Sequence, residues 1–275
     1  MIFKRYIKDF SYKSLKNIAL FINTLLKPLS IKLIKLKKDL DFPIDATKRD
    51  IEIIKCVLNS NPDKKLSMVP VDRLMAVISA TKYIIENNIE GDFVECGVWR
   101  GGNLIIFQKF IEKYNLQKKI YAYDTFEGMS NPEEIDRTFD GKSSIEALNK
   151  IREKKIKRDE NILVAECSIE KVLENFKKFS QKENLICIKG KVEETLKLKD
   201  NLPNKISILR LDTDWYSSTK IELEILFPLL EKNGILIIDD YGYWQGAKKA
   251  VDEYFKDKQL TMFKIDFTGR LIIKS

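Results

Sequence analysis

The sequence predicts an α/β fold, with a doubly wound, mostly parallel sheet of seven strands and a helical N-terminal extension. Short apolar runs alternate with helical patterns from residue 91 onwards, which is the order expected of βαβ units. Two of these runs, within residues 206–246, each lead directly into acidic residues. The last two runs flank a Thr268-Gly269 turn, and such a closing hairpin makes one strand antiparallel to the others.

The composition of the chain restricts the chemistry that it can perform. Its 275 residues include no histidine, so imidazole catalysis and histidine-ligated metals are excluded. A general base has to be Asp, Glu, Lys, Tyr or Cys. The four cysteines show no CxxC spacing and there is no cleavable signal sequence, which together favour free thiols and a cytoplasmic location.

The excess of positive charge is confined to the N-terminus. Residues 1–40 hold ten basic and two acidic side chains, which account for the whole net charge of +8, so no nucleic-acid partner is expected. No run approaches the ~20 apolar residues of a membrane-spanning helix. Two interpretations stay open for this basic amphipathic arm, residues 1–45. It contacts the inner face of a membrane peripherally, or it packs on the catalytic domain or a partner subunit of a homo-oligomer.

Residues 46–90 are expected to form a helical lead-in to the main domain at 91–275. One helix is expected from Thr47 to Leu58. A second begins near Pro70, because proline suits the first helical turn. Its apolar residues recur at helical spacing, and Gly91 is expected to end it.

The first strand, Asp92–Val98, runs into a glycine-rich loop and then a helix. Glu95, Gly97 and Gly101 belong to an ExGxxxGG pattern, in which glycines let a ligand approach the backbone closely. The N-terminus of the following helix offers free N–H groups to an anionic group. Glycines also serve tight packing, so it is the position at a strand–loop–helix junction that favours a ligand site.

The second strand, Lys119–Tyr123, ends at Asp124. An acid at this point of a nucleotide-binding fold accepts hydrogen bonds from two ribose hydroxyls; the alternative is an Asp that caps a helix or turn. Residues 130–160 make a long charged connection, which is either a lid over the site or a solvated insertion. Ser168 is expected to cap the next helix, and Leu185–Lys189 to form the third strand.

Residues 206–246 carry the strongest indication of a site. The pattern is strand, helix, strand, and the strands lead into Asp212-Thr213-Asp214 and Asp239-Asp240. Because the strands of a βαβ unit are parallel, both acidic ends lie at one edge of the sheet. Carboxylates gathered there repel one another unless a cation lies among them, and oxygen ligands suit Mg²⁺.

The remaining elements have their own signals. Thr219 and Glu222 fit a capping box for the helix of this stretch, and Asn233-Gly234 fits its C-terminal stop. A helix is expected after Gly246. The final strands are expected at Met262–Phe267 and Arg270–Ile273.

Several segments together resemble class I S-adenosylmethionine-dependent methyltransferases, and more closely the macrocin O-methyltransferase (TylF-like) family. The segments are GDFVECGVWRGG (91–102), YDTFEGM (123–129), KGKVEETL (189–196), LRLDTDWYSSTK (209–220), LIIDDYGYWQGAKKAVDEYF (236–255) and DFTGR (266–270). Residues 1–60 carry none of the resemblance. A Rossmann-like sheet is implied for the rest.

The resemblance implies a magnesium-dependent enzyme that moves a methyl group from S-adenosylmethionine to a sugar hydroxyl. By motif position, the implied metal ligands are Asp212, Asp239 and Asp240. The residues in or beside the cofactor motifs are Glu95, Gly97, Gly101, Asn103, Asp124 and Ser168. Asp212 also falls where a base is assigned in relatives, and Asp214 is the second candidate for the catalytic base. Many family members read DDYGH where this chain ends the motif in Tyr243, so no histidine relay is available here.

Other classes of function compete with this one. The Asp212-Thr213-Asp214 motif resembles the DxD motif of metal-dependent glycosyltransferases, although such an enzyme does not need the glycine-rich loop. A non-enzymatic scaffold would be indicated only if the acids did not bind metal. The basic arm and the lysine-rich composition favour a lipid-linked surface glycan as the acceptor, and a sugar-containing small molecule stays open.

Overall fold

The computed structural model describes residues 42–58, 65–153 and 164–275. The predictions for the basic arm therefore lie outside the described residues, except at its last four positions. One compact unit extends from Phe42 to Ser275. Within the described part of this unit, every helix is too short or too polar to cross a lipid bilayer.

A seven-stranded sheet forms the centre of the unit, in the order β3-β2-β1-β4-β5-β7-β6. The strands are β1 (Asp92–Cys96), β2 (Ile120–Asp124), β3 (Leu185–Lys189), β4 (Ile206–Leu211), β5 (Leu230–Ile238), β6 (Met262–Lys264) and β7 (Arg270–Ile273). Strands β1 to β5 pair in parallel, whereas β7 is antiparallel to both β5 and β6. The predicted doubly wound, mostly parallel fold with a closing hairpin is confirmed.

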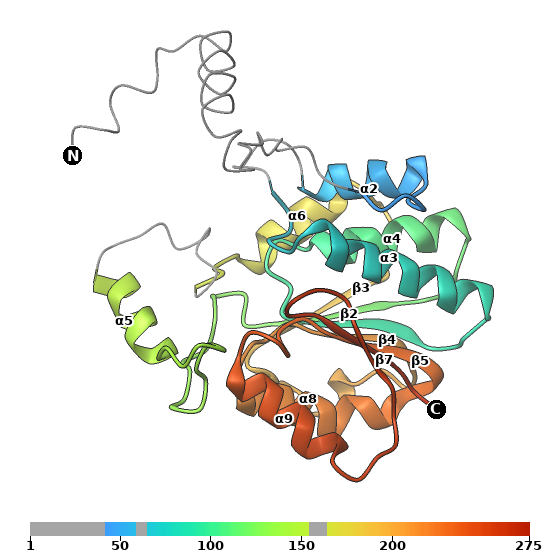
Figure 1. The fold of residues 1–275 in the computed structure, drawn as a ribbon. Coiled ribbons are helices and arrows are strands. Elements are labelled where there is room, and N and C mark those ends of the chain that lie inside the picture. The colour runs from blue at the N-terminus through green and yellow to red at the C-terminus, as the bar shows by residue number, and fades with distance from the viewer. Residues whose placement is uncertain (1–41, 59–64, 154–163) are drawn as a thin grey trace, which may run out of the picture. The chain divides into compact units, whose positions relative to one another are not determined.

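Helices cover both faces of this sheet (Figure 1). They are α2 (Lys48–Leu58), α3 (Val71–Glu86), α4 (Gly102–Lys113), α5 (Ser144–Glu153), α6 (Ile169–Lys177), α7 (Val192–Thr195), α8 (Tyr216–Leu226) and α9 (Gln245–Phe255), with short 3₁₀ turns η3 (Lys199–Asn201) and η4 (Phe227–Leu229). Helices α2, α3 and α4 pack together on one face, and α8 packs beside α9 on the other.

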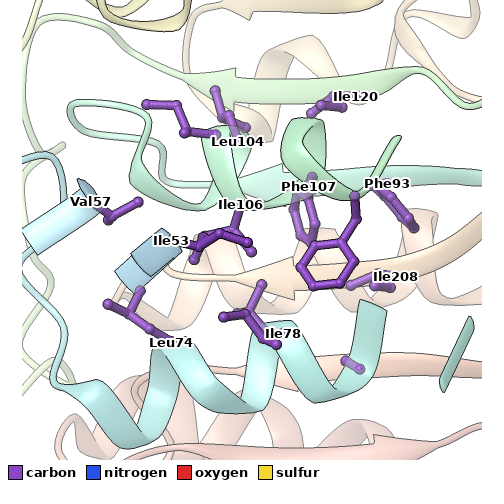
Figure 2. Close-up of a cluster of buried hydrophobic side chains, with 14 of the residues drawn as sticks. Ile53, Val57, Leu74, Ile78, Phe93, Leu104, Ile106, Phe107, Ile120 and Ile208 are labelled. Carbon is purple, nitrogen blue, oxygen red and sulfur yellow. The ribbon is translucent and has the colours of Figure 1, made fainter. Parts of the chain in front are cut away.

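The apolar sides of the lead-in helices form one core with the sheet (Figure 2). Ile53 of α2, Leu74 of α3 and Ile106 of α4 are buried, in the same cluster as Phe93 and Ile208 of the sheet. Burying one aliphatic side chain of this size contributes about 1.5–3 kcal/mol. The predicted helices at residues 46–90 are thus integral to the core that supports the sheet.

The prediction for the end of α8 was wrong. Asn233-Gly234 does not stop this helix but lies inside β5, where Asn233 has a φ of 62°. Helix α8 ends at Leu226, and η4 follows with Pro228, which has no N–H to continue an α-helix. The pairing register between β4 and β5 shifts at this point, so the kink at Asn233 absorbs the extra residues of β5.

The predicted capping box of α8 was also wrong. The helix begins at Tyr216, and Thr219 and Glu222 lie beyond its first residues. The Tyr216 N–H donates to Asp136 Oδ1 at 2.8 Å, so the cap comes from a residue eighty positions earlier in the chain. Glu222 is instead fully buried and accepts a hydrogen bond from Thr213.

Smaller differences concern the ends of other elements. Helix α3 ends at Glu86 rather than at Gly91. Gly91 has a φ of 97°, and a Cβ there would lie 2.8 Å from the backbone of Ile206, so glycine is needed for the close approach to β4. Strand β1 ends two residues earlier than predicted, before Gly97, and β6 ends at Lys264 because Asp266 accepts the N–H groups of the hairpin turn.

Candidate active site at the carboxyl edge of the sheet

The glycine-rich loop after β1 lies directly against the loop after β4. Gly97 has a φ of 83°, and a Cβ on it would lie 2.0 Å from the carbonyl oxygen of Asp212. Gly101, with a φ of 84°, precedes the first turn of α4. Glycine at position 97 therefore lets the predicted cofactor loop and the first acidic loop meet without a side chain between them.

Asp124 joins the loops that follow β1 and β2. Its carboxylate accepts hydrogen bonds from the backbone N–H groups of Val98 at 2.6 Å, Trp99 at 3.1 Å and Phe126 at 2.7 Å. Burial raises the pKa of Asp124, and these three N–H groups oppose that rise. The turn-forming role weighed as the alternative for this acid is thus present, and the carboxyl also lines the cavity described below.

A buried polar network connects the first strand to the acidic strand. Glu95 Oε1 accepts from Asn103 Nδ2 at 2.8 Å and from Arg210 at 2.7 Å, and all three side chains are almost fully buried. Burial raises the pKa of Glu95 to about 7, with Arg210 acting in the opposite direction. Glu95 Oε2 and Asn103 Oδ1 are buried without a hydrogen-bond partner in the protein.

Three carboxyl groups converge at the ends of β4 and β5. Oxygens of Asp212, Asp214 and Asp240 lie within 4.8 Å of one another. Burial raises the pKa of all three, to about 7 for Asp214, and repulsion from neighbouring acids adds to the rise. Asp240 Oδ2 is buried and has no hydrogen-bond partner. A set of oxygen donors with one such free oxygen fits a hard divalent cation, which would relieve the repulsion.

Asp239 is differently placed. Its Oδ1 accepts from Arg210 at 2.5 Å and its Oδ2 contacts Arg73, which also pairs with Asp266 at 3.1 Å. The three acids predicted as metal ligands therefore do not coincide with the three closest acids, because Asp214 occupies the place expected for Asp239. With a pair of guanidinium groups holding Asp239, its assignment as a metal ligand stays a prediction.

Arg210 and Arg73 are functional-site residues that sequence reasoning missed. Arg210 is 1% exposed near the end of the mostly apolar strand β4, and its guanidinium contacts Glu95, Asp212 and Asp239. A charged residue within an apolar strand was a usable signal, since a buried charge has to be paired. Arg73 gave no such signal, because an arginine on an amphipathic helix is ordinary.

One cavity, with roughly 910 Å³ of empty space and partly open to solvent, is lined by the loops after β1 and β2 and by the acids after β4 and β5. Of the predicted residues, its lining includes Gly97, Asp124, Asp212, Asp214, Asp239 and Asp240. The remaining predicted cofactor residues, Glu95, Gly101, Asn103 and Ser168, are not among the residues that line it. Ser168 caps α6, as expected, by accepting from the Lys171 N–H at 3.4 Å.

The connection at residues 130–160 packs against this edge in its described part, which runs to residue 153. The Gln245 N–H donates to the Arg137 carbonyl at 2.8 Å, and Trp215 Nε1 donates to the Ser130 carbonyl at 3.0 Å. The beginning of the connection thus forms one wall of the acidic end. The choice between a lid and a solvated insertion also depends on residues 154–163, which lie outside the described part.

The strand order, the glycine loop after β1 and the acid after β2 define a class I methyltransferase fold, whose donor is S-adenosylmethionine. The family model of macrocin-O-methyltransferase (TylF) matches residues 36–273. The chain belongs to the macrocin O-methyltransferase (TylF) family and is an O-methyltransferase.

Individual relatives agree with this placement. Demethyldecarbamoylnovobiocin O-methyltransferase of Streptomyces niveus is 29% identical over 195 residues, which are 70% of this chain and 69% of that protein. A tetracenomycin-C 4'-O-methyltransferase of Streptomyces olivaceus, named for its dimethoxy-rhamnosyl substrate, is 27% identical over 203 residues, 70% of this chain and 69% of that protein.

Two solved structures share the fold. The O-methyltransferase NovP superposes with a TM-score of 0.68 at 24% identity, over 82% of this chain and 98% of that one. The calicheamicin methyltransferase CalS11 superposes with a TM-score of 0.55 at 18% identity, over 88% of this chain and 99% of that one.

Proposed function

We propose that this enzyme transfers the methyl group of S-adenosylmethionine to a hydroxyl of a sugar, with Mg²⁺ bound among Asp212, Asp239 and Asp240. The observation that carries the proposal is that one cavity is lined both by Gly97 and Asp124 of the predicted cofactor loops and by the acids after β4 and β5. Named relatives modify glycosylated molecules: one acts on a rhamnosyl group, and another is a mycinamicin III 3''-O-methyltransferase from Micromonospora griseorubida, 24% identical over 198 residues.

The donor half of the site consists of the loops after β1 and β2. In the proposal, Asp124 accepts hydrogen bonds from the ribose hydroxyls, and the backbone of the loop from Gly97 to Gly101 faces the donor. In the proposal, Glu95 and Asn103 offer the donor their buried oxygens that lack a hydrogen-bond partner in the protein, and Ser168 lies beside the donor at the start of α6. Since S-adenosylmethionine supplies an already electrophilic methyl group, the protein has to align and deprotonate the acceptor.

The acceptor half consists of the acids. Bound there, Mg²⁺ would lower the pKa of the sugar hydroxyl and orient its oxygen. Asp212 and Asp240 offer oxygens within the close group, and Asp240 Oδ2 is free to serve. Asp239 Oδ2 would become available to a metal if Arg73 kept only its pairing with Asp266, while Oδ1 stays with Arg210.

Asp214 suits the role of the catalytic base better than Asp212. In the metal-free protein, burial raises the pKa of Asp214 to about 7, and proton transfer is most effective when the pKa of the base lies near the ambient pH. Asp212 is held by Arg210 at 2.7 Å, which opposes the rise in its pKa and fixes its carboxylate in position for a ligand role. The glycosyltransferase alternative, based on Asp212-Thr213-Asp214, is set aside because the chain belongs to a methyltransferase family.

The test combines a substrate screen with two variants. Methyl transfer would be measured over nucleotide sugars, soluble glycosides and lipid-linked glycans, with Mg²⁺ and with EDTA. We expect transfer to a sugar hydroxyl that EDTA abolishes. Asp240→Asn and Asp214→Asn are expected to bind S-adenosylmethionine normally in calorimetry and to lose about 10²–10⁴-fold in kcat. The exposed Asp257→Asn is the matched control.

Different results would remove different parts of the proposal. Full activity in EDTA, or near-normal turnover of Asp240→Asn, would refute the metal site. Normal turnover of Asp214→Asn would return the base to Asp212. Methylation of acceptors that contain no sugar would refute the acceptor class.

A further inference from the structure

Three aromatic side chains form a cluster that we call the aromatic platform: the exposed Phe139 and Phe267 and the half-buried Tyr243. The rings of Phe139 and Phe267 meet edge to face with centroids 5.0 Å apart, and Phe139 and Tyr243 are 5.7 Å apart. Phe139 is 55% exposed and Phe267 56% exposed. Exposed aromatic side chains that gather from distant parts of a chain are typical of an interaction site.

The position of the aromatic platform follows from the order of the strands. Along the carboxyl edge, Asp124 lies at the end of β2, then Gly97 after β1, then the acids after β4 and β5. Strand β7 pairs beside β5 and runs antiparallel, so the residues just before it, including Phe267, lie at this same edge. The platform therefore follows the acids on the side away from the donor loops.

The platform is held in place by hydrogen bonds between its three segments. The Gly242 N–H donates to the Thr268 carbonyl at 2.9 Å, which fixes the loop after β5 to the final hairpin. The Gln245 N–H donates to the Arg137 carbonyl at 2.8 Å, which fixes the same loop to the segment that carries Phe139. Preorganisation of this kind reduces the entropy lost when a ligand binds.

Polar residues are the chain neighbours of the two exposed rings. Asp140 and Lys142 form an ion pair at 2.6 Å in the segment that follows Phe139. Asp266 and Thr268 flank Phe267, and Asp266 also holds Arg73 at the cavity wall. A wholly apolar occupant would cover these groups and leave them desolvated. An occupant with an apolar face and hydroxyl groups at its edges would satisfy both the rings and the rim.

We propose that the aromatic platform binds the apolar C–H face of a sugar ring of the acceptor, with the acids reaching the hydroxyl that is methylated. This inference rests on the proposed function and deepens it, because it assigns a binding site to the carbohydrate part of the acceptor rather than to its carrier. Phe139 and Phe267 determine acceptor affinity. The chemical step and donor binding belong to other residues.

The test uses methyl glycosides of rhamnose, glucose, galactose and mannose as probes, with the full-length protein, S-adenosylhomocysteine and Mg²⁺. Saturation-transfer NMR reports which sugar C–H protons touch the protein. Phe139→Leu and Phe267→Leu keep apolar bulk but remove the ring. Phe263→Leu is the matched control, because Phe263 is 51% exposed on β6 and belongs to no aromatic pair among the described residues.

We expect the C–H signals to be strong for wild type and Phe263→Leu and to be lost in the two platform variants. For the probe that is methylated, KM should rise about tenfold in each platform variant with kcat nearly unchanged, which corresponds to about 1.4 kcal/mol of acceptor binding. S-adenosylmethionine affinity and thermal unfolding, measured in parallel, should match wild type.

Three results would overturn the inference. If wild type binds and methylates a sugar and the platform variants do so equally well, the platform is not the sugar site, while the proposed function stands. If the variants change only the oligomeric state in light scattering, the platform is a contact between copies. If wild type neither binds nor methylates any sugar, the proposed function fails and this inference fails with it.

Discussion

Arg210 is the residue on which the electrostatics of the site depend most. It is buried in β4 and contacts one carboxylate from each of three strands: Glu95 from β1, Asp212 from the end of β4 and Asp239 from the end of β5. Attraction between fixed, buried charges is strong, but a single unpaired member is costly. Arg210 thus links the donor side to the acceptor side of the cavity.

Replacing Arg210 with methionine is expected to lower the free energy of unfolding by about 3–5 kcal/mol at pH 8, because the buried carboxylate of Glu95 loses its arginine partner and buried Asp239 keeps only Arg73. Without the guanidinium, the folded-state pKa values of Glu95 and Asp212, which burial already raises, rise further. Acids with a raised folded-state pKa make the protein less stable as the pH rises towards that pKa. The loss of unfolding free energy in the variant should therefore be smaller at pH 5.5. Urea unfolding at both pH values measures it.

The control for this substitution is Arg137→Met, whose ion pair with Glu134 is exposed and is expected to contribute less than about 1 kcal/mol. Equal losses at pH 5.5 and pH 8 in Arg210→Met would mean that the defect comes from packing rather than from unpaired charge.

At the scale of elements, the connection at residues 130–153 is joined to α8 through Asp136. This carboxylate is 1% exposed, accepts the Tyr216 N–H and lies against Gly246 at the start of α9, where any Cβ would clash with it. Asp136→Ala should cost about 1–2 kcal/mol through loss of the cap. It should also free the connection, seen as faster tryptic cleavage at Lys142 and Lys150. Asp257→Ala, exposed and away from the connection, should change neither, and unaltered cleavage in Asp136→Ala would contradict the anchoring role.

At the scale of the whole molecule, the proposed metal site couples ion binding to folding. Burial and mutual repulsion raise the pKa of Asp212, Asp214 and Asp240 in the metal-free protein, so protons occupy these groups at low pH and compete with Mg²⁺. Mg²⁺ at 100 times its Kd adds ~2.7 kcal/mol of stability, or roughly 5–10 °C in Tm for a domain of this size.

Thermal unfolding with and without Mg²⁺ tests this coupling. The rise in Tm should be larger at pH 8 than at pH 6 in the wild type, and should be absent in Asp240→Asn. The same rise in Asp240→Asn would show that the ion binds elsewhere on the protein.

The sequence predicted the fold well because its strong signals are local. Apolar runs, the glycine-rich loop and the final turn each depend on neighbouring residues, and the seven strands were all expected. The errors at α8 were of the opposite kind. Asn233-Gly234 is an ordinary helix stop in sequence, yet Pro228 ended the helix earlier and strand pairing with β4 took up Asn233. Asp136, which caps the start of α8, lies too far from that helix along the chain for any local pattern to identify it.

By itself, the sequence determined which acids reach the carboxyl edge, since strand direction fixes where Asp124, Asp212, Asp239 and Asp240 emerge. Only the tertiary structure decided which partners each of these acids contacts. Arg210 and Arg73 hold Asp239, whereas Asp214 joins Asp212 and Asp240 in the close group. The physical reason is that the nearest charge decides the protonation state and the partner of a buried carboxylate. That charge comes from whichever strand or helix packs beside it.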